Sequence, residues 1–148
     1  MKVKICGLTE AEHVKTCVNN NTDFCGFILN YPKSHRFVSF DKAKDLTSLD
    51  KKKSKFVGVL VNPQENELKK FSLLNIDYFQ LYGSFSNEKL IEIKEKYKKK
   101  IIISIQVAFK EDIDNYKNYK DAADIILFDS RGYEKSLSWN YNWVKNIN

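Results

Sequence analysis

The 148-residue sequence has few of the residues on which metal sites and disulfide frameworks depend. Its three cysteines, Cys6, Cys17 and Cys25, are an odd number at spacings that match neither a zinc site nor a disulfide pattern. Its two histidines, His13 and His35, are not paired at metal-ligand spacing. We therefore expect no metal site, and we interpret Cys17 and Cys25 as small buried hydrophobic residues.

Long apolar runs and glycine-rich loops are also missing. No stretch of about 18 apolar residues occurs, so we expect no membrane-spanning segment and no membrane partner. The N-terminus enters a strand-like run with no apolar signal segment or small-residue cleavage site, which predicts a cytoplasmic protein. No Walker A motif is present, and Gly7 is the only glycine where a dinucleotide-binding sheet would carry three.

The net charge of +6 raises the question of a nucleic-acid partner. Lysines concentrate in residues 51–53, 94–100 and 110–120, and acidic residues interrupt most of these clusters. That pattern is typical of solvated helix faces, and no interleaved aromatic and basic motif is present. We expect no nucleic-acid partner, with RNA binding as a distant alternative. The charge favours attraction of small anionic molecules to a cleft.

Short apolar runs alternate with amphipathic stretches along the whole chain. The runs are continuous rather than alternating, which predicts strands buried on both faces of a parallel sheet. No linker divides the chain, so we expect one domain over residues 1–148. Both an open doubly wound sheet and a (β/α) barrel fit, and the missing glycine fingerprint favours the barrel. The six predicted strands are residues 2–6, 24–29, 56–61, 78–81, 101–105 and 125–128.

Helix start signals follow most of these strands. Thr9 with Glu12 forms a capping-box pattern, and Ser39 and Ser86 are predicted N-caps. Asn62, Pro63 and Glu65 fit the N-cap, N1 and N3 positions of another helix. A further helix is expected over residues 112–120.

Polar residues end several strands that are otherwise apolar. In a barrel, Cys6, Gln80, Gln106 and Asp129 would share the mouth formed by the carboxyl ends of the strands. Cys6 also precedes a helix N-terminus, where the helix dipole and free N–H groups favour a thiolate. The thiolate can act either as a nucleophile or as a base.

The base is the more coherent interpretation. A nucleophilic cysteine needs an adjacent histidine, but His13 points along its helix and His35 lies in a predicted flexible turn. Cys6 as base with Asp129 as acid would remove a proton from one atom and deliver one to another, as isomerisation requires. Arg36, in the loop after the second strand, could clamp a carboxylate with two hydrogen bonds.

Five segments resemble, in order and spacing, the motifs of the phosphoribosylanthranilate isomerase family of tryptophan biosynthesis. They are residues 4–9 (KICGLT), 34–39 (SHRFVS), 58–62 (GVLVN), 80–83 (QLYG) and 127–130 (LFDS). The resemblance covers essentially the whole chain. It implies an α/β fold of the TIM (β/α)8-barrel family.

The resemblance also implies a reaction and roles for individual residues. The reaction is the Amadori rearrangement of N-(5-phosphoribosyl)anthranilate to 1-(2-carboxyphenylamino)-1-deoxyribulose 5-phosphate, an isomerisation of a small anionic phosphosugar without a cofactor. Cys6 would take the proton from ribose C2, and Asp129 would protonate the ring oxygen. Arg36 would hold the anthranilate carboxylate, Gln80 would line the pocket, and Gly7 would belong to the substrate-binding residues.

The chain departs from the family pattern in three places. Tyr82 stands where the family usually has histidine, and tyrosine is bulkier and cannot carry a positive charge. The loop over residues 132–139 keeps its final tryptophan but has one glycine, whereas the corresponding loop of the family is glycine-rich. Only about six βα units are present, without the seventh and eighth strands and their phosphate-binding loops.

The missing units leave alternatives open. Strands one and six would have exposed apolar edges. We expect a piece of a longer protein, a truncated gene product, or a chain whose barrel is completed by self-association or by another chain. The alternative to an isomerase is a barrel-derived, non-catalytic binding or interaction protein that lacks the phosphate site.

Overall fold

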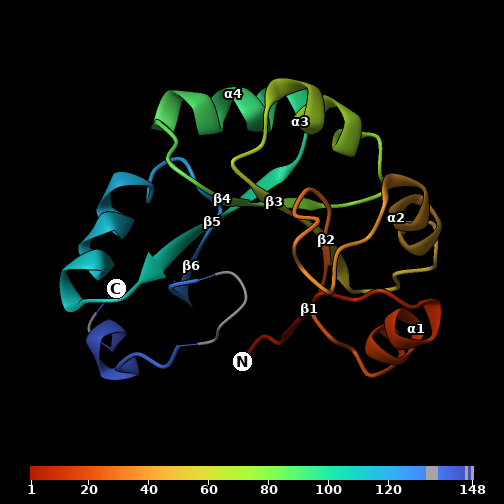
Figure 1. Cartoon of the computed structure of the whole chain (residues 1–148), viewed down its shortest axis with the longest axis horizontal. Coiled ribbons are helices and arrows are strands. Elements are labelled where there is room, and N and C mark those ends of the chain that lie inside the picture. The colour runs from red at the N-terminus through yellow and green to blue at the C-terminus, as the bar shows by residue number, and fades with distance from the viewer. Residues whose placement is uncertain (133–136, 146, 148) are drawn as a thin grey trace.

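The computed structural model describes residues 1–132, 137–145 and 147, and its centre is one parallel sheet of six strands. The strands are hydrogen-bonded in their order along the chain, and Figure 1 shows them as an open arc with the helices outside. This sequential order is that of a barrel, since a doubly wound sheet reverses its strand order. The strands are β1 (Lys4–Cys6), β2 (Phe24–Ile28), β3 (Lys55–Val61), β4 (Tyr78–Tyr82), β5 (Lys100–Val107) and β6 (Ile125–Ser130).

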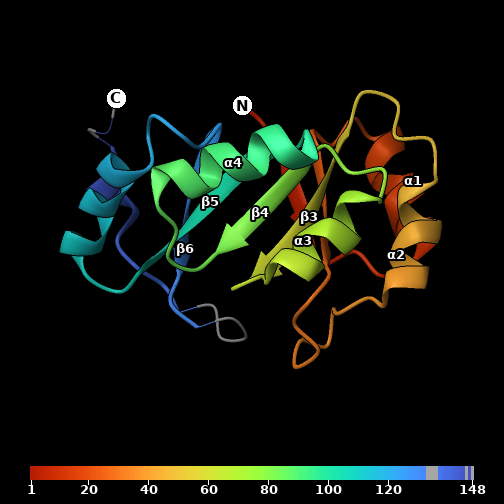
Figure 2. The same ribbon diagram turned by 90° about the horizontal axis from the view of Figure 1, so that it is seen from above.

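Each strand is followed by a helical segment that returns the chain to the other end of the sheet, as Figure 2 shows from above. Two predicted N-caps are confirmed. The Ser39 hydroxyl accepts from the Lys42 N–H at 3.3 Å, and the Ser86 hydroxyl accepts from the Lys89 N–H at 3.2 Å. The segments are α1 (Ala11–Asn19), α2 (Phe40–Thr47), α3 (Glu65–Ser72), α4 (Asn87–Tyr97) and the 3-10 helices η1 (Lys110–Asn118) and η2 (Tyr141–Val144).

Two predicted helix starts are wrong because the preceding residues stay with the sheet. The N–H groups of Gly7 and Leu8 both donate to the Gly26 carbonyl oxygen, and α1 begins only after Glu10 instead of after Thr9. The Asn62 N–H donates to the Tyr82 carbonyl at 2.8 Å, and Asn62 adopts a left-handed φ of 43°.

The N-cap of α3 is therefore Gln64, whose N–H donates to the Glu67 carboxylate at 2.8 Å. The expected helix over 112–120 is the 3-10 helix η1, which starts at Lys110. The Asp112 carboxylate accepts from the N–H groups of Ala108 and Phe109 and fixes that start.

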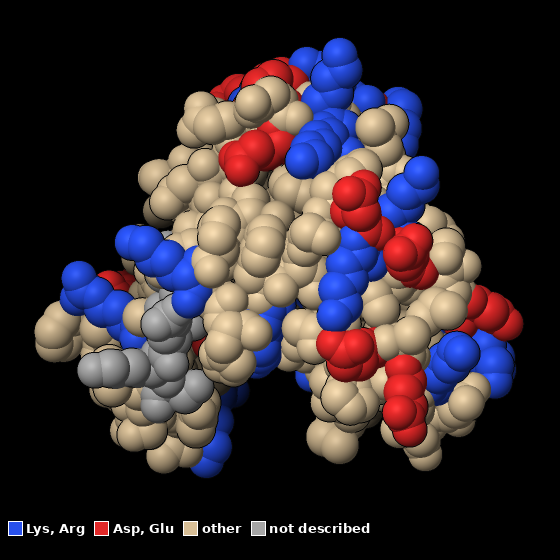
Figure 3. Space-filling model, turned by 45° about the vertical axis from the view of Figure 1, so that its right-hand side comes forward, with Lys and Arg blue, Asp and Glu red and all other residues tan. Residues whose placement is uncertain are grey.

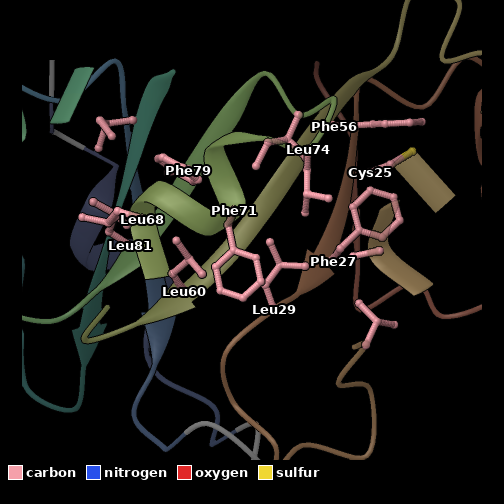
Figure 4. Close-up of a cluster of buried hydrophobic side chains, with 14 of the residues drawn as sticks. Cys25, Phe27, Leu29, Phe56, Leu60, Leu68, Phe71, Leu74, Phe79 and Leu81 are labelled. Carbon is pink, nitrogen blue, oxygen red and sulfur yellow. The ribbon is translucent and has the colours of Figure 1, made fainter. Parts of the chain in front are cut away.

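Apolar side chains fill both faces of the sheet at β2 to β5, as predicted. The same prediction is wrong for β1 and β6, which end the sheet and have no buried residue. The larger cluster lies between the sheet and the helices, and Figure 4 shows Phe27, Phe56 and Phe79 within it. The smaller cluster lies on the concave face and is built around Phe24, Val57, Val59, Tyr78 and Ile102. Cys25 is fully buried as predicted, whereas Cys17 is only partly buried.

The outer surface carries charges of both signs. Figure 3 shows lysine and arginine interspersed with aspartate and glutamate on the face that it presents. Local ion pairs include Lys42 with Glu10 and Lys89 with Glu65. None of the helices in the described part of the chain is long and apolar enough to cross a membrane.

Strands β1 and β6 each have one neighbour and form the two ends of the sheet. Val3, just before β1, exposes 43% of its surface, and Ile5, within β1, exposes 41%. Every residue of β6 is partly exposed. The predicted open, apolar ends are therefore present. The sheet is an open six-unit part of the (β/α)8 architecture.

Candidate active site

A cavity of about 320 Å³ lies at the carboxyl ends of the strands, inside the arc of the sheet. Its volume is at the lower end of the range usual for ligand pockets. Four of the five residues predicted for the site line it: Cys6 from β1, Arg36 from the loop after β2, Gln80 from β4 and Asp129 from β6. The first and last strands thus place a thiol and a carboxyl in one cavity.

Strand geometry explains which side chains reach the cavity. Alternate residues of a strand face the same side, so Lys4 joins Cys6, Tyr82 joins Gln80, and Leu127 joins Asp129 in the lining. The parallel pairing sets Gln80 beside Val59 and Tyr82 beside Val61, which also line the cavity. A mixed polar and apolar wall results.

Asp129 is held by two hydrogen bonds. The Tyr82 phenol donates to its Oδ2 at 2.6 Å, and the backbone N–H of Ser130 donates to its Oδ1 at 2.8 Å. Burial raises the pKa of the Tyr82 phenol, and the adjacent Asp129 carboxylate raises it further. Tyr82 therefore stays protonated and remains a hydrogen-bond donor to Asp129.

Gln80 is 1% exposed and connects Tyr82 to β5. Its Nε2 donates to the Tyr82 hydroxyl at 3.2 Å and to the Ser104 hydroxyl at 3.1 Å. Its Oε1 is buried and has no hydrogen-bond partner among the described residues. A buried acceptor of this kind is costly unless a donor arrives, so a ligand N–H or O–H would be favoured there.

The Cys6 thiol is partly buried over Gly26 of the neighbouring strand. A Cβ on Gly26 would lie 2.9 Å from Cys6 Sγ and 3.1 Å from Lys4 Nζ. The absence of a side chain at Gly26 therefore leaves the space that both groups occupy. The Lys4 ammonium group and the thiol therefore face the same residue.

Arg36 is exposed at the cavity mouth, and its loop is fixed at both ends by backbone hydrogen bonds. Its Nη1 donates to the Cys6 carbonyl oxygen at 3.2 Å. Gly7 lies beneath it with a left-handed φ of 82°, and a Cβ there would lie 2.6 Å from Arg36 Cδ. Gly7 thus supports the position of Arg36, although it is not among the residues that line the cavity.

Other predicted candidates lie elsewhere. Gln106 lines a separate cavity with Ser84 and residues of η1, and neither His13 nor His35 lines the cavity of Cys6. Sequence reasoning missed Lys4, and it treated Tyr82 only as a departure from a family pattern. Both could have been found by the two-residue spacing that places them on the faces of Cys6 and Gln80.

The loop after Asp129 and the expected absence of a metal site complete the comparison with the sequence. Residues 133–136 of the glycine-poor loop after Asp129 lie outside the described residues. Within the ranges that the structure describes, no group of three or more His, Cys, Asp or Glu side chains could hold a metal ion.

Comparison with known proteins identifies the family. The family model of N-(5'-phosphoribosyl)anthranilate (PRA) isomerase matches residues 3–147. The chain is 33% identical over 132 residues to the N-(5'-phosphoribosyl)anthranilate isomerase of Zymomonas mobilis, covering 88% of this chain and 62% of that protein. It is 34% identical over 146 residues to the enzyme of Thermoanaerobacter pseudethanolicus, covering 94% and 68%. The chain thus spans about three fifths to two thirds of these relatives.

Solved structures agree with the sequence comparison. The phosphoribosyl anthranilate isomerase of Thermotoga maritima superposes with a TM-score of 0.81 at 30% identity, covering 94% of this chain and 66% of that one. A structure of such an isomerase in complex with reduced 1-(o-carboxyphenylamino)-1-deoxyribulose 5-phosphate superposes with a TM-score of 0.77 at 30% identity, covering 88% and 65%. The chain belongs to the N-(5'-phosphoribosyl)anthranilate isomerase family.

Proposed function

We propose that this chain catalyses the Amadori rearrangement of N-(5-phosphoribosyl)anthranilate to 1-(2-carboxyphenylamino)-1-deoxyribulose 5-phosphate, a step of tryptophan biosynthesis. The observation that carries the proposal is the single cavity lined by Cys6, Arg36, Gln80 and Asp129. A structural relative at 30% identity was solved with a reduced form of that product, which supports an anionic phosphosugar as ligand.

Asp129 is the proposed general acid. Its carboxyl group gives a proton to the ring oxygen of the ribose, the bond between that oxygen and C1 breaks, and the nitrogen lone pair forms a C1–N double bond. The carboxylate that remains accepts hydrogen bonds from Tyr82 and the Ser130 N–H. Those two donors stabilise the charge that appears on Asp129 when the ring opens.

Cys6 is the proposed general base. Its thiolate removes the proton from C2, the electron pair forms a C1–C2 double bond, and the C1–N double bond returns its electrons to nitrogen. The resulting enol-amine tautomerises to the ketone. The Lys4 ammonium group lines the same cavity and faces Gly26 as the thiol does, whereas α1 starts only at Ala11 and not directly after Cys6 as expected. The steps move protons within one substrate and require no redox cofactor.

Two further residues are proposed to bind substrate. Arg36 holds the anthranilate carboxylate at the cavity mouth, where a guanidinium can donate two parallel hydrogen bonds to it. Gln80 offers its buried Oε1 to a hydroxyl or amine hydrogen of the substrate. Gly7 contributes by leaving room for the Arg36 side chain.

Completion of the barrel by self-association or by another chain is also proposed. It is supported by β1 and β6, each of which has one strand neighbour and exposes apolar side chains. A neighbouring structure of the Thermotoga maritima isomerase is described as that of monomers generated from a dimeric protein. Sedimentation of the purified chain should give a mass above that of one copy, and a monomer at all concentrations would argue against self-association.

Loss of the fluorescence of the anthranilate substrate provides the assay of turnover. The chain is assayed alone and mixed with a polypeptide holding only the last two βα units of a relative, which contains no counterpart of Cys6 or Asp129. Turnover should appear and should fall about 100-fold or more in Cys6→Ala and in Asp129→Ala, since positioned acids and bases contribute on that scale. Cys17→Ala, a cysteine outside the cavity, should keep the wild-type rate.

Two outcomes of this assay would contradict the proposed function or the proposed base. A chain that circular dichroism shows to be folded, with no turnover either alone or in the mixture, would favour the non-catalytic alternative. Turnover that persists unchanged in Cys6→Ala would remove Cys6 from the proposed role.

A further inference from the structure

Three polar side chains connect β5 to the proposed acid on β6 through β4. Gln80 Nε2 donates to both Ser104 Oγ and Tyr82 Oη, and Tyr82 Oη donates to Asp129 Oδ2. Tyr82 and Asp129 are 47 residues apart in sequence, and their hydrogen bond of 2.6 Å is shorter than either hydrogen bond of Gln80. The group at the end of this chain of bonds is the carboxyl to which the proposed function assigns a proton transfer.

The direction of these hydrogen bonds is fixed by chemistry. Gln80 Nε2 faces the Tyr82 hydroxyl and an amide nitrogen can only donate, so the Tyr82 oxygen accepts from Gln80 and its own hydrogen is donated to Asp129. Burial and the neighbouring carboxylate both raise the pKa of Tyr82. The phenol is therefore an uncharged donor throughout the pH range of an enzyme assay.

We propose that Tyr82 is a positioning residue for Asp129, holding the carboxyl group in one orientation and stabilising the carboxylate left after its proton reaches the substrate. This inference rests on the proposed function. Tyr82 transfers no proton itself: the O–H bond stays intact, and the proton delivered to the ring oxygen comes from Asp129. Unlike a histidine, the phenol supplies a donor here without the possibility of a positive charge.

Removal of the phenolic hydroxyl should slow the reaction without weakening substrate binding. A hydrogen bond to a charged acceptor has a strength that corresponds to about 10-fold to 100-fold in rate, so Tyr82→Phe should lower kcat by that factor with little change in KM. Tyr82→His, which can donate from a ring nitrogen, should recover part of the loss. Tyr97→Phe removes a hydroxyl that bonds Glu65 on the outer surface and should leave kcat unchanged.

A spectroscopic measurement tests the contact without any turnover. With tyrosine labelled by ¹³C at the phenolic carbon, Tyr82→Phe identifies the Tyr82 resonance among the eight tyrosines. In the wild type this resonance should remain that of the phenol as the pH rises past the range in which exposed tyrosines ionise. In Asp129→Asn it should titrate at lower pH, because the negative neighbour is gone.

The two measurements separate failure of this inference from failure of the proposed function. An unaltered Tyr82 titration in Asp129→Asn, or an active Tyr82→Phe with wild-type kcat, would overturn the positioning role while leaving the isomerase intact. A Tyr82 titration that depends on Asp129 in a folded chain without turnover would support the contact and overturn the proposed function. A rise in KM alone in Tyr82→Phe would assign Tyr82 to substrate binding instead.

Discussion

Replacement of Gly26 by alanine displaces the Cys6 thiol without altering any proposed catalytic group. Gly26 pairs with Cys6 in the β1–β2 register and is buried. The new methyl carbon would lie 2.9 Å from Cys6 Sγ, whereas ordinary contacts begin at 3.4 Å. The thiol must therefore move by about 0.5 Å, or rotate away from the cavity.

The expected size of the effect follows from this displacement. A misplacement of about 1 Å can cost about 100-fold in rate, so a shift of half that size should lower kcat by about 10-fold. Alanine restricts the unfolded chain and stabilises by about 0.4–1 kcal/mol, while the close contact costs about 1–3 kcal/mol. The free energy of unfolding should consequently fall by roughly 1 kcal/mol.

Gly58→Ala is the matched control on the adjacent strand. Its methyl would lie 2.8 Å from Ile76 Cδ1 and Leu29 Cδ1, in the layer between the sheet and the helices. Steady-state kinetics and urea titration of both variants should show a comparable loss of stability but a lower kcat only in Gly26→Ala. Wild-type kcat in a folded Gly26→Ala chain, or an equal loss in both variants, would refute the placement of Cys6 as the base.

Three further predictions test the site and the fold. Arg36→Ala should raise KM by about 10-fold or more with a smaller effect on kcat. The KM of Arg36→Lys should lie between those of the wild type and Arg36→Ala, since lysine cannot form the paired hydrogen bonds. Steady-state kinetics in which Arg36→Ala lowers kcat by as much as it raises KM would contradict this role. Ser39→Ala should lower the free energy of unfolding by about 1 kcal/mol in urea titration, since the Lys42 N–H loses its acceptor. Burial raises the pKa of the Cys25 thiol from 9.0 to about 12, so the unfolded chain loses this proton first and the free energy of unfolding should fall as pH rises from 9 to 12. The fall should be smaller in Cys25→Ala, and identical pH dependence in the two proteins would contradict the shift.

Local sequence signals were sufficient for much of the architecture. The apolar runs located all six strands. For β2 to β5 the reason is that strands buried on both faces need apolar residues at nearly every position. Ser39 and Ser86 were identified as caps because an N-cap depends only on its own helix. Cys6 and Asp129 could be placed in one cavity because the carboxyl ends of parallel strands lie together.

The predictions that were wrong, and the contact that was missed, concern residues whose neighbours are distant in the sequence. Asn62 has the composition of an N-cap, but the Tyr82 carbonyl of β4 engages its N–H and keeps it with the sheet. Gln106 ends a strand like Gln80, yet it lies with Ser84 and η1 in another cavity. The hydrogen bond between Tyr82 and Asp129 joins residues on non-adjacent strands, which no local pattern encodes.

The assignment of base and acid is tested most directly by the isotope effect on kcat for substrate carrying deuterium at ribose C2. Serine is a far weaker base than a thiolate, so Cys6→Ser should make removal of the C2 proton rate-limiting and give an isotope effect well above unity. Asp129→Asn should slow ring opening, a step in which the bond between C2 and its hydrogen stays intact, and should give an isotope effect near unity. The opposite pattern, or equal effects in the two variants, would contradict the account.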